Sequence, residues 1–245
     1  MQLLAEAYTH TLHSARPLAE SLGVLNWLEA RGRKHQRALW LRTLFEIYRV
    51  EGLVALDLCW WTFAAQDAVA AHLAARPGAR VFEYGSGAST VWLARRAAEV
   101  HTVEHDLSWS EVMRMQLADV PNVRLHAIAP TPRRAATAEA PSGRRGYADA
   151  DFADYVRAID DVPGTFDLIV IDGRSRAACL NHAYERLAPG GLILFDDPHR
   201  ARYRAALASC SLDVRHLRGL KPCLPYRDGT ALLRRPGRAH DTSAA

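Results

Sequence analysis

One short segment of this chain combines an acidic residue, alternate glycines and hydroxyl side chains, a set that suits a loop holding a small cofactor. Residues 83–90 read Glu-Tyr-Gly-Ser-Gly-Ala-Ser-Thr, and a second acidic residue, Glu104, closes the next apolar run. Glycines at alternate positions let the backbone turn tightly against a ligand, and an acidic residue about 20 positions further on can accept hydrogen bonds from ribose hydroxyls. The spacing therefore predicts a cofactor that contains a nucleoside.

Two other interpretations of the same segment remain open. Gly85 and Gly87 can serve the geometry of a strand-to-helix turn without any ligand. A nicotinamide-binding domain also has Gly-x-Gly and a later acidic residue, although Thr90 stands where its third glycine belongs. An oxidoreductase that uses a nicotinamide is therefore an alternative.

Acidic residues also close apolar runs later in the chain. Asp172 follows residues 166–171, and Asp196 with Asp197 ends a later run. Ligands of open parallel sheets bind outside the carboxyl ends of the strands, so these carboxylates would share one crevice. Such a crevice repels a pyrophosphate and attracts a ligand with hydroxyls, an amino group and a positive centre. We predict Asp172, Asp196 and His199 as candidates for removing a proton from a substrate, with pairing to nearby arginines as their simpler role.

These residues need a scaffold in which short strands alternate with helices. Apolar runs predict strands at 81–84, 100–104, 123–128, 166–171 and 191–195, and amphipathic patterns predict helices at 64–75, 91–98, 110–117 and 177–187. Strands of this kind separated by helices are typical of a mostly parallel sheet with helices on both faces. The predicted fold class is therefore α/β.

The ends of the chain differ from this alternating region. Residues 1–58 carry apolar side chains at helical spacing and predict a helical N-terminal extension. Residues 59–236 form the predicted cofactor-binding domain, and we expect the tail at 237–245 to be disordered. Within the domain, residues 129–146 hold prolines, glycines and arginines among small residues, which predicts a flexible insertion.

Charge and composition narrow the choice of partners. The net charge is +4 and the pI about 9.0, but the basic residues are spread along the chain, which argues against nucleic acid. The four cysteines form no Cys-x-x-Cys pair, so neither zinc nor a disulfide framework is indicated. No apolar run reaches the roughly 20 residues of a membrane span. We expect a cytoplasmic protein with a small-molecule substrate and no membrane partner, whose oligomeric state the sequence leaves open.

From about Trp60 to Arg235, the order of these motifs resembles that of the class I S-adenosylmethionine-dependent methyltransferases. Residues 83–87 resemble the first motif of that family, 166–173 its fourth-strand motif and 187–197 its passage from a helix into the fifth strand. The resemblance implies a Rossmann-like sheet of seven strands, completed by an antiparallel pair near 219–222 and 230–233. It also implies S-adenosylmethionine as the cofactor.

The resemblance assigns cofactor-binding residues by position. The assigned residues are Glu83, Gly85, Ser86, Gly87, Ser89, Glu104, His105 and Asp172. In the family, the glycine loop wraps the methionine part of the cofactor, and the acidic residue at the position of Glu104 takes the ribose hydroxyls. Ser89 departs from the pattern, because a third glycine often stands there, and we expect its side chain to cap a helix that begins at Thr90.

A divalent metal ion is a further possible cofactor. The metal-dependent O-methyltransferases carry an aspartate after the fourth strand and an Asp-Asn pair after the fifth, where this chain has Asp172 and the pair Asp196-Asp197. Oxygen ligands of this kind suit magnesium or calcium. The same carboxylates can instead accept hydrogen bonds from loop amides, and we assign no metal ligands.

We therefore predict an S-adenosylmethionine-dependent methyltransferase that methylates a small hydroxyl-bearing acceptor by direct displacement. Three alternatives remain. The first is a protein that binds the cofactor without catalysis, and the second is an RNA methyltransferase that uses the arginines of 31–37 and 133–145. The third is the nicotinamide-dependent oxidoreductase.

Overall fold

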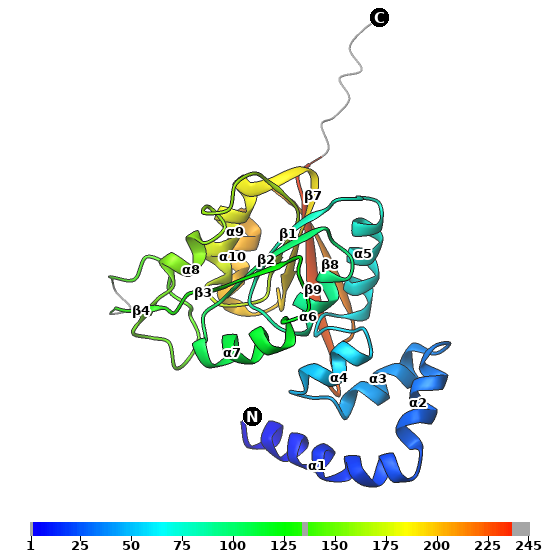
Figure 1. Ribbon diagram of the computed structural model, residues 1–245. Helices are drawn as coiled ribbons and strands as arrows, with labels where there is room; N and C mark the ends of the chain where they lie inside the picture. The colour runs from blue at the N-terminus through cyan, green and yellow to red at the C-terminus, as the bar shows by residue number, and fades with distance from the viewer. Residues whose placement is uncertain (1, 134–136, 237–245) are drawn as a thin grey trace, which may run out of the picture.

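The computed structural model describes residues 2–133 and 137–236 and has a seven-stranded sheet at its centre (Figure 1). The strands are β1 (Arg80–Tyr84), β2 (Glu99–Glu104), β3 (Val123–Ala127), β6 (Phe166–Ile171), β7 (Leu187–Asp196), β8 (Asp213–Leu220) and β9 (Arg227–Arg234). Their order is β3-β2-β1-β6-β7-β9-β8, parallel from β3 to β7 and antiparallel where β9 meets β7 and β8. This arrangement confirms the predicted α/β fold. The predicted tail at 237–245 lies outside the described residues.

Helices cover both faces of the sheet. On one face, Val81 and Leu168 are buried together with side chains of α5 (Phe63–Ala74) and α6 (Ala88–Ala94). On the other face, Phe82 and Ile169 are buried with side chains of α8 (Ala153–Arg157) and α9 (Arg176–Arg186). Successive side chains of a strand point to opposite faces of the sheet. Apolar side chains therefore lie on both faces, and helices must cover both.

The strand order changes side at β1, which lies between β2 and β6 in the sheet. The strands β2 and β3 extend the sheet on one side of β1, and β6 and β7 extend it on the other. The connections that leave β1 and β6 therefore run apart and open a crevice at the carboxyl ends, which is where open α/β sheets bind ligands.

Several element boundaries differ from the predicted ones. The helix α6 begins at Ala88 because Gly87 stands at its N-cap and donates its backbone N–H to the Thr90 hydroxyl at 3.0 Å. The strand β7 begins at Leu187 because that residue already pairs with Phe166 of β6. The strand β8 ends at Leu220, so the residues that follow it leave the sheet.

From residue 2 onward, where the description begins, the N-terminal extension forms four helices, which lie below the sheet in Figure 1: α1 (Gln2–Ser21), α2 (Val24–Gly32), α3 (Gln36–Leu44) and α4 (Val50–Ala55). Leu53 shares a buried cluster with Ala88 of α6 and with Met113 of α7 (Leu107–Gln116). The indole N–H of Trp40 donates to the carbonyl oxygen of Leu224 at 2.8 Å. The extension is thus joined to the carboxyl edge of the sheet.

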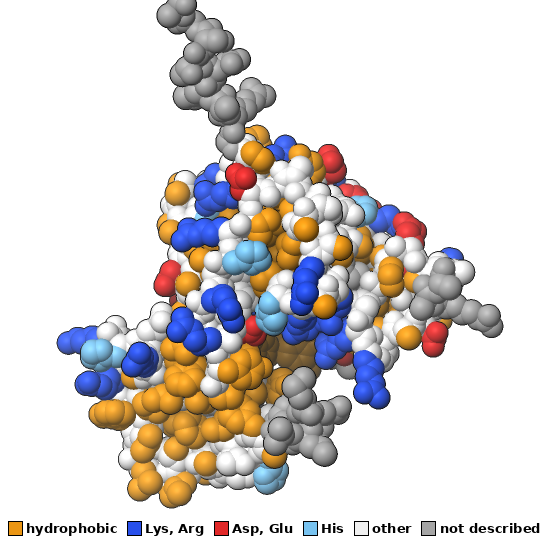
Figure 2. Space-filling view, turned by 180° about the vertical axis from the view of Figure 1, so that it is seen from behind, with side chains coloured by type: hydrophobic (Ala, Val, Ile, Leu, Met, Phe, Trp, Pro, Cys, Tyr) orange, Lys and Arg blue, Asp and Glu red, His pale blue; other side chains and the backbone are white. Residues whose placement is uncertain are grey.

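The outer surface of the extension carries many apolar side chains (Figure 2). The large exposed ones are Leu18, Leu22, Val24, Trp27, Leu41 and Tyr48. Apolar side chains gathered on one surface are typical of interaction sites. Among residues 2–133 and 137–236, none of the helices has the length and apolar character that a membrane crossing requires.

The segment 129–146 is partly packed against the domain in its described residues. Its short strand β4 (Thr131–Pro132) pairs with β5 (Ala150–Asp151), and the buried Asp151 carboxylate accepts the backbone N–H groups of Glu139 and Ala140 at 3.0 Å. Amino-acid composition does not indicate this packing. The hydrogen bonds are donated to the Asp151 carboxylate by backbone N–H groups, which do not depend on the type of side chain. Residues 134–136 of the predicted insertion lie outside the described part.

Candidate active site

A cavity of about 500 Å³ lies at the carboxyl ends of β1, β2, β6 and β7. Its volume is in the usual range for small-molecule sites. The loops after these strands, the extension and the segment after β8 all contribute to its lining, which includes Tyr48, Trp60, Ser86, Glu104, Asp172 and Lys221. Side chains from distant parts of the sequence therefore line one cavity.

The two glycines of the loop after β1 have different roles. Gly85 has a φ of +98°, and a Cβ there would lie 2.8 Å from the Cα of Gly173, so the backbones that leave β1 and β6 touch at this point. A Cβ on Gly87 would only contact Trp60 at an ordinary 3.6 Å. Backbone geometry therefore demands glycine at position 85, whereas the glycine at 87 keeps space free beside Trp60 in the cavity.

Glu83, on β1, accepts hydrogen bonds from the residues that follow the glycine loop. Among the described residues it does not line the cavity. The hydroxyl of Ser89 donates to its Oε1 at 2.5 Å, and the hydroxyl of Thr90 donates to its Oε2 at 2.6 Å. Burial raises the pKa of Glu83 to about 7. Ser89 borders the cavity but bonds to Glu83 instead of capping α6, so the predicted capping role of Ser89 is wrong and Gly87 holds that position.

Glu104 lies at the end of β2 and lines the cavity. The backbone N–H and the hydroxyl of Ser86 both donate to its Oε2 at 3.0 Å, and the N–H groups of His105 and Asp106 donate to its Oε1 at 2.8 and 2.9 Å. Burial acts to raise the pKa of Glu104. The hydrogen bond and charge of His105, together with the hydrogen bonds from these amides, outweigh burial and hold the pKa of Glu104 below its usual range. Glu104 is therefore a fixed carboxylate that joins the two loops.

His105 lies beside Glu104 and also lines the cavity. Its Nδ1 is 2.7 Å from Oε1 of Glu104, and its Nε2 is 3.2 Å from the hydroxyl oxygen of Tyr147. These two contacts hold the imidazole between β2 and the segment that contains Tyr147. Of the predicted cofactor-binding residues, all except Glu83 line this one cavity.

Asp172, at the end of β6, presents a partly exposed carboxylate to the cavity. Its Oδ1 accepts a hydrogen bond from Arg176 at 2.7 Å, its Oδ2 accepts one from the indole N–H of Trp61 at 3.2 Å, and its side chain is 23% exposed. Burial and the nearby carboxylate of Asp196 raise the pKa of Asp172 to about 7, against the opposing charges of Arg176 and Lys221. A group with such a pKa can take up or release a proton near neutral pH.

The pair Asp196-Asp197 surrounds a buried lysine. The ammonium nitrogen of Lys221 is 2.8 Å from Oδ2 of Asp196 and 3.2 Å from Oδ1 of Asp197. Oδ1 of Asp196 also accepts the Thr230 hydroxyl at 3.0 Å. Burial raises the pKa of Asp196. Burial also acts to raise the pKa of Asp197, but the charges of Lys221, Arg176 and Arg200 outweigh it and lower that pKa.

The structure separates His199 from this group and adds Lys221 to it. The side chain of His199 is 61% exposed, faces Asp228 at 3.5 Å and is absent from the cavity lining among the described residues. Asp197, with a φ of +53°, and Arg200 both line the cavity, whereas His199 between them does not. Sequence reasoning missed Lys221 as a site residue, although it is one of only two lysines in the chain and lies within the predicted antiparallel pair at 219–222.

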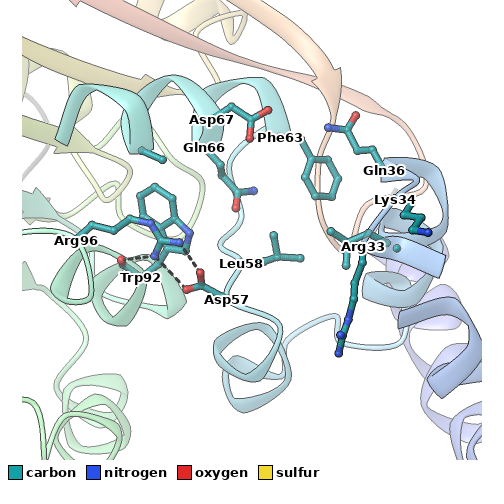
Figure 3. Close-up of a pocket in the computed structure, with 13 residues that line it drawn as sticks. Arg33, Lys34, Gln36, Asp57, Leu58, Phe63, Gln66, Asp67, Trp92 and Arg96 are labelled. Atoms are coloured by element: carbon teal, nitrogen blue, oxygen red, sulfur yellow. Dashed lines mark hydrogen bonds and ion pairs between the residues drawn. The ribbon is translucent and has the colours of Figure 1, made fainter. Parts of the chain in front are cut away.

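A second cavity of about 360 Å³ lies between the extension and the helices α5 and α6 (Figure 3). Arg33 and Lys34, from the basic segment 31–37, border it on the side opposite Arg96, whose guanidinium is paired with Asp57. None of the described residues that line this cavity also lines the first one. The basic segment of the extension is therefore not part of the cavity that holds Glu104 and Asp172.

Comparison with known proteins connects this arrangement to one enzyme class. Residues 82–198 match a family model described as a methyltransferase domain. The fold is similar to that of an O-methyltransferase from Bacillus cereus in complex with S-adenosylhomocysteine, with a TM-score of 0.52, 18% identity, and coverage of 78% of this chain and 90% of that chain. It also resembles an rRNA methylase from Streptococcus thermophilus, with a TM-score of 0.49, 13% identity, and coverage of 70% and 94%. No curated protein matches the sequence.

Proposed function

We propose that this chain, a class I S-adenosylmethionine-dependent methyltransferase by its methyltransferase domain and its fold, methylates a hydroxyl oxygen of a small acceptor. The observation that carries the proposal is the partly exposed carboxylate of Asp172 in the cavity that also contains the glycine loop and Glu104. The cavity of about 500 Å³, which Ile47 and Tyr48 of the extension help to line, has a volume usual for a small-molecule site.

The residues around Glu104 suit S-adenosylmethionine. Glu104 would accept hydrogen bonds from the ribose hydroxyls, while Ser86, Gly87 and His105 would border the rest of the nucleoside and the methionine part. When bound, the cofactor supplies a methyl group on a positively charged sulfur. The space that Gly87 leaves beside Trp60 is a feature of this chain that a bound ligand could occupy, because a larger side chain would fill it.

Asp172 would act as the proton acceptor. Methylation of a hydroxyl oxygen forms a carbon–oxygen bond, breaks the carbon–sulfur bond and releases the hydroxyl proton. Arg176 holds Oδ1 of Asp172 at 2.7 Å, which leaves Oδ2, with its single longer bond to Trp61, as the atom that receives the proton. Asp196 is fully engaged by Lys221 and Thr230, so its role would be to fix the position and charge of Lys221.

A direct test measures transfer of labelled methyl groups to a set of matched acceptors. We expect purified protein with labelled S-adenosylmethionine to modify small phenols, catechols or hydroxy acids, and to leave analogues in which an amine replaces the hydroxyl unmodified. An RNA transcript in the same assay should stay unlabelled. Transfer to nitrogen analogues or to RNA alone would overturn the proposed acceptor class.

The donor set at Asp196 and Asp197 does not fit a divalent metal ion, and we propose that Lys221 supplies the positive charge at this position. Magnesium and calcium need several oxygen ligands at about 2.0–2.6 Å. Here the ammonium nitrogen of Lys221 already lies between the two carboxylates, with Arg176 within 3.8 Å of both. No group of three or more His, Cys, Asp or Glu side chains in 2–133 and 137–236 is arranged to hold a metal ion.

Replacing Lys221 with methionine should turn the cluster into a cation site. The variant leaves Asp196, Asp197 and Asp228 without their shared ammonium, so we expect it to bind Mn²⁺ at least about tenfold more tightly than the wild type in a calorimetric titration. Lys221→Arg keeps the charge and is the control, which should bind as weakly as the wild type. Tight Mn²⁺ binding by the wild type, or none by a folded K221M variant, would contradict the assignment.

A further inference from the structure

Among the described residues, three arginines border the cavity and come from separate segments: Arg144, Arg174 and Arg200. Arg174 is two residues after Asp172, in the turn between β6 and α9, and Arg200 follows β7. In Figure 2, Lys and Arg side chains gather around a hollow beside the apolar surface of the N-terminal helices. The cavity therefore has a basic side in addition to its carboxylates.

The carboxylates of the cavity leave two of these arginines without a counter-charge. Arg200 pairs with Asp197, whereas within the described part of the chain neither Arg144 nor Arg174 forms an ion pair with a carboxylate. The Nε of Arg174 is buried without a hydrogen-bond partner, and its guanidinium lies over the ring of Tyr147 at 5.3 Å. A buried polar group without a partner is rare in native proteins, and a bound ligand is one explanation for it.

The like charges also repel one another. Burial and the nearby charges of Arg174, Arg200 and Arg202 lower the pKa of Arg144. Bringing an anion to this place would relieve the repulsion. A guanidinium offers a planar pair of N–H donors that matches the two oxygens of a carboxylate or phosphate.

We propose that Arg144 and Arg174 bind an anionic group, a carboxylate or a phosphate, of the methyl acceptor itself. The inference deepens the proposed function and depends on it, because the acceptor is the molecule whose hydroxyl faces Asp172. Arg174 and Asp172 share one turn, so a hydroxyl at the carboxylate and an anion at the guanidinium belong to the same small molecule. Tyr147, whose ring lies under the Arg174 guanidinium, also lines the cavity.

The test compares binding of an acid with binding of its neutral amide, and it needs no methyl transfer. The protein, saturated with S-adenosylhomocysteine, is titrated with 2-hydroxybenzoate, with 2-hydroxybenzamide and with inorganic phosphate, and the fluorescence of Trp60 and Trp109 in the cavity wall reports binding. We expect the acid to bind at least about tenfold more tightly than the amide, and phosphate to compete with it. Equal binding of acid and amide, or no binding of either anion, would overturn the proposal.

Single substitutions test whether Arg144 and Arg174 cause the preference for the acid over the amide. Arg174→Gln and Arg144→Gln should each abolish most of the preference for the acid, whereas Arg145→Gln, an exposed neighbour outside the cavity lining in the described residues, should keep it. The affinity for S-adenosylhomocysteine should stay within about twofold in all three variants. A parallel fall in that affinity would assign the arginines to the carboxylate of the cofactor and overturn the proposal. Because binding is measured without turnover, this result is independent of the acceptor panel.

Discussion

Replacing Asp172 with asparagine is expected to lower kcat by about 10² to 10⁴, the usual range for losing a general base. Asparagine keeps the size of the side chain and can still accept the Trp61 N–H, but it cannot take a proton from the acceptor. In the wild type, kcat should rise with pH through about 7, as Asp172 loses the proton that burial and Asp196 favour. The variant should lose that rise, which a pH series of initial rates will measure.

Asp167 offers a matched control for this experiment. It lies on the same strand, β6, at the opposite end from the cavity, where it accepts the backbone N–H of Arg80 at 3.0 Å. Asp167→Asn should keep both kcat and its pH dependence. If D172N retained the wild-type rate and pH profile, proton transfer to Asp172 would not be part of the reaction.

Replacing Glu104 with alanine is expected to weaken cofactor binding at least about 100-fold. Hydrogen bonds to a charged group contribute about 1.5–3 kcal/mol each, and the two hydroxyls of a ribose would both lose their acceptor. The loop after β1 would also lose the bonds from Ser86 to Oε2, so its amides would no longer be held in place. Calorimetric titration with S-adenosylhomocysteine measures the effect.

Glu99 is the corresponding control, because it is a glutamate on the same strand, β2, at the end remote from the cavity. Its carboxylate is 41% exposed and pairs with Arg80, so Glu99→Ala should leave cofactor affinity unchanged. Thermal melts of both variants distinguish a lost ligand contact from a lost fold. Unchanged affinity in a folded E104A variant would refute the ribose assignment.

Much of the architecture could be predicted because the strands are short, apolar and bounded by turn residues. The runs 166–171 and 191–195 identify buried strands by composition alone, and the structure confirms the sheet that they form. The sequence pattern predicts the start of α6 too late, because it predicts Ser89 as the cap of the helix. Its hydroxyl bonds instead to Glu83, a partner on the preceding strand whose direction a sequence does not reveal.

By itself, the sequence determined which residues end each strand, and therefore which carboxylates come to one edge of the sheet. Strand direction alone decides this, since parallel strands bring their carboxyl ends together. Only the tertiary structure decided which of these side chains face the cavity. His199 lies exposed outside the described cavity lining, while the segment after β8 brings Lys221 between Asp196 and Asp197. Such choices depend on packing between distant segments, which local residue patterns do not encode.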